Sequence, residues 1–164
     1  MADRGGCHRR ARPLQKEQED DVFRLSYVGK GSYVAELEDN RAFQHSLVLC
    51  DFLPKRYGLK TIDLAALVNL ATGWKMTAED GIEVGARSLH QARLFNLKCG
   101  ITAEADTLPK RFFKEILKEG PSAGLKIDQG GLALMKKDYY EARGWDEQGV
   151  PKKETLARFG LEGL

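Results

Sequence analysis

The sequence predicts an all-α protein, a helical bundle of five to six helices. Three observations support this fold class. Apolar residues recur at intervals of three and four along most of the chain, as on the buried face of a helix. The periodic runs begin at residues that cap helices and end at glycines or prolines. Strand-like alternation is nearly absent, so a hairpin near residues 22–34 is the only sheet structure that we allow.

The first helix is expected over residues 32–52. A short extended stretch at residues 23–28 precedes it and ends at a pair of glycines, which break regular structure. Ser32 suits the N-cap position because its hydroxyl can accept a bond from the first turn. Pro54 then closes the helix, since proline cannot continue the hydrogen-bond ladder.

The second and third helices carry clear end signals. The second begins at Thr61 or Asp63 and ends at Gly73, which suits a left-handed C-cap. The third begins at residues 77–80, a capping box with Asp in place of the usual Glu. It ends at Gly100.

The remaining helices are shorter. Asp128 can cap one that ends at Gly144, and Pro151 suits the first turn of a final helix over residues 152–159. Before these, residues 110–119 form a helix with four apolar residues facing inward: Phe112, Phe113, Ile116 and Leu117.

Composition bounds the function classes. The chain has 42% hydrophobic and 30% charged residues and a net charge of +2, so no global field gathers nucleic acid or membrane. Positive charge concentrates in residues 1–20, predicted as a disordered basic segment ahead of a helical domain at residues 21–164. No apolar run resembles a signal peptide or a membrane span, so we expect a cytoplasmic protein.

The reactive side chains exclude several kinds of site. The histidines lack the one-turn spacing of a zinc hydrolase, and no phosphate-binding loop is present. Three cysteines more than forty residues apart argue against a disulfide framework and against a self-contained metal ribbon. Cys99, at a helix end, is interpreted as structural. From local chemistry alone, Cys50 is also a core residue rather than a ligand.

Four segments, in order along the chain, change that interpretation. The run at residues 45–52 is similar to an aspartate-x-x-glycine-leucine-cysteine segment, and residues 67–80 are similar to an "ATGW, T-x-E-D" stretch. Residues 93–112 and 139–151 match "RLFN, LP-x-R" and "YY-x-x-RGWD, G-x-P" stretches. Together they resemble the all-helical C-terminal domain of the tungsten-dependent aldehyde ferredoxin oxidoreductase family.

The resemblance implies a function and three site residues. Cys50 would be the last thiolate ligand of a 4Fe-4S cluster, and His45 and Leu49 would contact a tungsten bis-pterin. The enzyme would oxidise aldehydes to carboxylic acids and pass the electrons to ferredoxin. Because the other ligands and most of the pterin site come from remaining domains or a separate subunit, this chain is expected to be incomplete alone.

Three departures from the family pattern leave alternatives open. His45 stands where the family has an aspartate, Val48 where it has a glycine, and the pair Lys98-Cys99 where it has Arg-Glu. The first alternative is a degenerate paralogue that acts as a helical interaction module without a cluster. The second is a nucleic-acid binder that uses the basic N-terminal segment.

Overall fold

The structure, a computed structural model, describes residues 25–50, 52–120 and 122–164, without the side chains of residues 52 and 55. Within this part the fold is all-α, as predicted, and an isolated bridge between Trp145 and Pro151 is its only β pairing. Of the hairpin predicted near residues 22–34, residues 22–24 lie outside the described part, and residues 25–34 form none. The helices are α2 (Lys30–Ser46), α3 (Phe52–Tyr57), α4 (Thr61–Thr72), α5 (Ala78–Lys98), α6 (Arg111–Lys114), α7 (Gln129–Ala142) and α8 (Lys153–Phe159), with a 3-10 turn at Ala103–Ala105.

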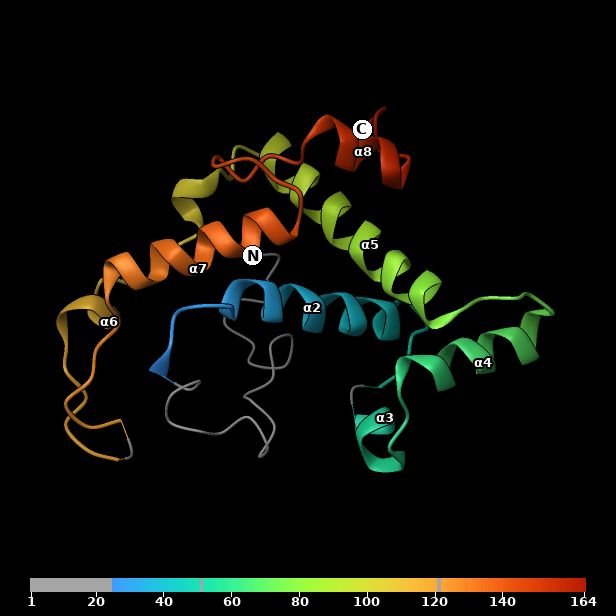
Figure 1. The fold of residues 1–164 in the computed structure, drawn as a ribbon, viewed down its shortest axis with the longest axis horizontal. Coiled ribbons are helices and arrows are strands. Elements are labelled where there is room, and N and C mark those ends of the chain that lie inside the picture. The colour runs from blue at the N-terminus through green and yellow to red at the C-terminus, as the bar shows by residue number, and fades with distance from the viewer. Residues whose placement is uncertain (1–24, 51, 121) are drawn as a thin grey trace.

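Helix α2 forms the centre of the fold. It packs against both α5 and α7, while α4 and α8 pack against α5 (Figure 1). Two glycines allow these close contacts. A Cβ atom at Gly31 would collide with the α7 backbone at Tyr139 and Met135, and one at Gly85 would collide with the carbonyl oxygen of Asp39 on α2. Because glycine has no Cβ atom, the backbone of α2 can approach those of α7 and α5 more closely at these two points than any other residue would allow.

The start and end of α2 differ from the prediction. The helix begins at Lys30 after Gly29, so the assignment of Ser32 as N-cap is wrong. The cap comes from another helix, because the Asp138 carboxylate on α7 accepts bonds from the Gly31 and Ser32 amides at 2.8 and 3.0 Å. The helix ends at Ser46 rather than residue 52, and Pro54 lies in the first turn of α3, where proline is tolerated.

Helices α4, α5 and α7 confirm the predicted end signals. Helix α4 starts at Thr61 and is followed by Gly73, and the Thr77 hydroxyl accepts from the Asp80 amide at the start of α5. The Asp128 carboxylate accepts from the Gly131 amide at 2.7 Å and caps α7. No described helix is long and apolar enough to cross a membrane.

The expected helix over residues 110–119 is wrong. Helix α6 ends at Lys114, and the chain then reverses, so that Leu117 exchanges backbone bonds with Leu125 and Gly124. These pairings satisfy amide groups that a longer helix would have satisfied. The side chains of Phe112, Ile116 and Leu117 are about half exposed rather than inward.

Candidate functional site

The loop between α2 and α3, residues 47–50, carries two of the three predicted site residues, Leu49 and Cys50. The Leu47 amide closes the last turn of α2 by donating to the Phe43 carbonyl, and the Val48 amide donates to the His45 carbonyl at 2.9 Å. Val48 has a φ of 57°, a left-handed conformation that is strained for a β-branched residue. Its side chain is 92% exposed.

Cys50 lies on the surface, so the interpretation of a core cysteine from local chemistry is wrong. Its thiol is free and the residue is exposed, whereas Leu47 and Leu49 are half-buried. Its backbone is well held, because the Cys50 carbonyl accepts from the Leu53 amide at 3.0 Å and from the Gln44 side-chain amide at 3.2 Å. The chain therefore presents a fixed backbone with an accessible thiol.

His45 lies in the last turn of α2, half-buried and close to this loop. It lines a cavity of about 260 Å³ between α2 and α5, together with Glu38, Arg41, Ser46 and Ser88. Pockets that enclose a whole small molecule usually measure about 300–1,000 Å³. This cavity can therefore receive only part of a large ligand.

Arg143, the C-cap residue of α7, forms the most buried ion pair among the described residues. It pairs with Asp39 and, at 3.2 Å, with Glu38, and it donates to the Ala35 carbonyl at 2.9 Å. The Tyr139 hydroxyl donates to Glu38 at 2.6 Å. Burial raises the pKa of Asp39, although Arg143 opposes the shift. These contacts join α2 to α7.

Arg93 on α5 forms a second buried cluster. It pairs with Asp106 at 2.9 Å and donates to the Gly149 carbonyl at 2.7 Å, with its guanidinium 5.1 Å from the centre of the Trp145 ring. Burial raises the pKa of Asp106, whereas the hydrogen bond from the Tyr140 hydroxyl and the charge of Arg93 lower it. Through these contacts, residues 139–151 pack the C-terminal part of the chain against α5.

His90 completes the second cluster. Its Nδ1 atom accepts from the Trp145 indole at 2.9 Å, and its ring lies 4.7 Å from that of Phe159 on α8. Burial, with smaller effects of Arg143 and Arg158, lowers the pKa of His90 to about 4. The imidazole is therefore neutral near pH 7, as its role as acceptor requires.

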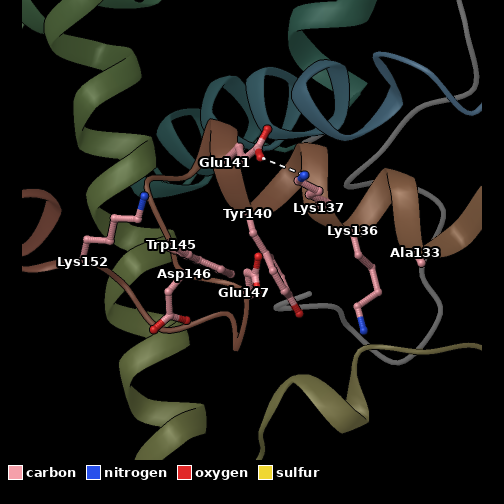
Figure 2. A pocket seen from close by; sticks show the side chains of 9 residues that line it. All are labelled: Ala133, Lys136, Lys137, Tyr140, Glu141, Trp145, Asp146, Glu147 and Lys152. Carbon is pink, nitrogen blue, oxygen red and sulfur yellow. Dashed lines mark ion pairs between the residues drawn. The ribbon is translucent and has the colours of Figure 1, made fainter.

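Larger cavities lie away from the 47–50 loop, among them two that none of the predicted site residues lines. One, of about 500 Å³, lies between α7 and the following loop, with Tyr140 and Trp145 among lysines and carboxylates (Figure 2). The other, of about 1,000 Å³, is lined by residues around Tyr27, α6 and Leu125. Neither brings together side chains with evident chemistry.

The structure brings His45, Leu49 and Cys50 to one end of α2 but does not assemble a complete metal site. Within the described ranges, no three His, Cys, Asp or Glu side chains are grouped to hold a metal ion. The side-chain contact between Gln44 and Cys50 was not predicted, because nothing in the sequence distinguishes Gln44 from other polar helix residues.

Comparison with known proteins matches nearly the whole chain to one protein family. The family model described as "Aldehyde ferredoxin oxidoreductase, domains 2 & 3" matches residues 1–161, which include the basic segment that lies outside the described residues. A tungsten-containing aldehyde ferredoxin oxidoreductase of Pyrococcus furiosus is 36% identical over 163 residues, 96% of this chain and 26% of the relative.

Two further relatives are also similar to this chain over most of its length. The tungsten-containing aldehyde ferredoxin oxidoreductase of Pyrococcus horikoshii is 34% identical over 97% of this chain and 26% of its own length. A protein of Pyrococcus furiosus named "Aliphatic sulfonate oxidoreductase, WOR-like subunit" is 33% identical over 87% of this chain and 23% of its own length. The chain thus spans about a quarter of the length of these relatives.

Proposed function

Because the chain belongs to the aldehyde ferredoxin oxidoreductase family, we propose that it works within a larger enzyme that oxidises aldehydes to carboxylic acids. In this proposal the two electrons pass through a 4Fe-4S cluster to ferredoxin. The names of the relatives support the oxidoreductase class and the tungsten cofactor. Since the chain spans only about 26% of those relatives, most of the machinery belongs to other parts of the enzyme.

The accessible thiol of Cys50 is the observation that carries the proposal. A cluster of this kind takes four thiolates, and a single exposed cysteine on a held backbone suits one ligand of a set completed by another domain. The absence of a three-ligand group among the described residues agrees with a shared site rather than a self-contained one. Cys99 is exposed too, but no resemblance assigns it a ligand role.

The conformation of Val48 gives independent support. The family has glycine at this position, and glycine is the residue that adopts left-handed angles without strain. Here the backbone keeps a φ of 57° although the residue is valine. The loop therefore retains the path that the family's glycine would allow, and this path leaves the neighbouring thiol accessible.

His45 and Leu49 are proposed to contact the tungsten bis-pterin. When bound, that group supplies the two-electron oxidation of an aldehyde and water to a carboxylic acid. The cavity that His45 lines, about 260 Å³ in volume, leaves room for one edge of such a group, whereas Leu49 does not line it. An imidazole accepts at most one hydrogen bond where an aspartate accepts several, so His45 would hold the pterin edge less firmly.

The free thiols also bear on location. Cys50 and Cys99 are both exposed and unpaired, which is typical of a reducing compartment. We therefore propose a cytoplasmic enzyme.

Substitution of Cys50 tests the cluster assignment. In the assembled enzyme, Cys50→Ser should lower the iron content and electron transfer to ferredoxin without changing the helical content seen by circular dichroism. Cys99→Ser is the matched control, because it removes another exposed thiol and should change neither quantity. Full iron content in Cys50→Ser would contradict the assignment and favour a helical interaction module without a cluster.

A further inference from the structure

We propose that Gln44 is a positioning residue that sets the direction of the Cys50 thiol; the inference rests on the proposed cluster role of Cys50. Gln44 is only 5% exposed, and its side-chain amide donates to the Cys50 carbonyl at 3.2 Å. It thus connects the end of α2 directly to the residue that would bind iron. Gln44 itself touches neither the cluster nor the thiol in this role.

Arg41 fixes the orientation of the Gln44 amide. The Arg41 Nη1 atom donates to Oε1 of Gln44 at 2.8 Å. Because a guanidinium carries only donors, the oxygen of the amide must face Arg41 and its nitrogen must face the Cys50 carbonyl. Arg41, Gln44 and the Cys50 carbonyl therefore form a directed chain of hydrogen bonds.

The position of Cys50 depends on its backbone, because its side chain is exposed and is not enclosed by packing. Its carbonyl is held from one side by the Leu53 amide, at the start of α3, and from the other by Gln44. Removing the Gln44 bond leaves α3 as the main restraint, and α3 has only six residues. Groups that orient a metal ligand commonly tune the metal without touching it.

Two substitutions break this bond in different ways. Gln44→Glu keeps an acceptor for Arg41 but places an oxygen against the Cys50 carbonyl, and Gln44→Met removes both bonds without adding charge. Asn69→Asp is the matched control, because the Asn69 amide likewise donates to a backbone carbonyl, that of Met76, at 2.8 Å. Asn69 lies on α4, which is not part of the 47–50 loop.

In the assembled enzyme, both Gln44 variants should keep their iron as isolated but change the electron paramagnetic resonance spectrum of the reduced cluster. They should also release iron to a chelator about tenfold faster, a usual effect of removing a group that orients a metal ligand. Asn69→Asp should do neither. An unchanged spectrum and release rate in both Gln44 variants, or loss of helical content in both, would overturn the proposal.

A second readout separates this inference from the proposed function. In the 164-residue chain alone, the rate of Cys50 alkylation relative to Cys99 should change in both Gln44 variants and not in Asn69→Asp. If Cys50→Ser retains its iron, the cluster role fails while this ratio still reports the Gln44 contact. If Cys50→Ser loses iron but the ratio and the spectrum of the Gln44 variants stay unchanged, only the positioning role fails.

Discussion

The Arg143 ion pairs beside α2 and the 47–50 loop at its end differ in burial: the charged side chains of the first are buried and paired, whereas the thiol of the second is exposed. Arg143 and its carboxylate partners Glu38 and Asp39 are at most 15% exposed and form ion pairs with one another. In the loop, Cys50 is exposed and its thiol has no partner cysteine. The buried ion pairs therefore have both partners within this chain, whereas the loop holds the Cys50 backbone in place and leaves the Cys50 side chain accessible.

The largest expected effect on stability comes from removing the buried guanidinium of Arg143. Arg143→Ala leaves Glu38 and Asp39 buried without their counter-ion, which should lower the free energy of unfolding by about 3–5 kcal/mol. Urea unfolding followed by circular dichroism measures this change. Arg158→Ala is the control, because its pair with Glu83 is exposed and should contribute at most about 1 kcal/mol. Equal losses in the two variants would contradict the contrast between core and surface.

Acid should weaken the core through His90. The unfolded imidazole binds a proton near pH 6.5, but the folded one only near pH 4, so between these values the unfolded state holds more protons. The stability that His90 contributes is present above pH 6.5 and is lost as the pH falls toward 4, by about 2 kcal/mol after allowance for solvent screening.

His90→Gln separates this effect from the titration of carboxylates. Glutamine can still accept from the Trp145 indole but does not titrate. Between pH 7 and 4, the free energy of unfolding should therefore fall less in the variant than in the unsubstituted protein. Parallel pH profiles for the two proteins would show that His90 does not carry the effect.

The smallest effect concerns the loop alone. Val48→Gly relieves a left-handed conformation that costs a residue with a Cβ roughly 1–2 kcal/mol, offset in part by the greater freedom of glycine in the unfolded chain. A net gain of about 0.5–1 kcal/mol should appear as a higher urea midpoint. Ser46→Gly, which places glycine in the last turn of α2, should lower the midpoint instead. A lower midpoint in Val48→Gly would mean that the loop is not strained.

The helices that the sequence predicts correctly have ends determined by neighbouring residues. Thr77 and Asp80 cap α5, and Asp128 caps α7, because all the required groups lie within one turn. The start of α2 was misplaced because its cap, Asp138, is 106 residues away from Ser32 in the chain. The end of α6 differs from the prediction because Leu117 exchanges backbone bonds with Leu125 and Gly124, on the segment that follows it, instead of continuing the helix.

The candidate site was predicted only in part. The resemblance selected Cys50, His45 and Leu49, and the structure places all three at one end of α2, but local chemistry wrongly placed Cys50 in the core. Whether they bind the cluster and the pterin stays a prediction. Gln44 could not be found from the sequence, because a helical glutamine next to a loop has no pattern that reveals a bond to a backbone carbonyl.

The close contacts at Gly31 and Gly85 have a consequence for the gene. Every missense change in a glycine codon introduces a Cβ atom, and at these two positions that atom would collide with backbone rather than with a movable side chain. Alanine and serine, usually the mildest replacements for glycine, should therefore disrupt the helix packing at these positions, as larger residues would. The two codons should be depleted of natural variants even though neither residue has any part in chemistry.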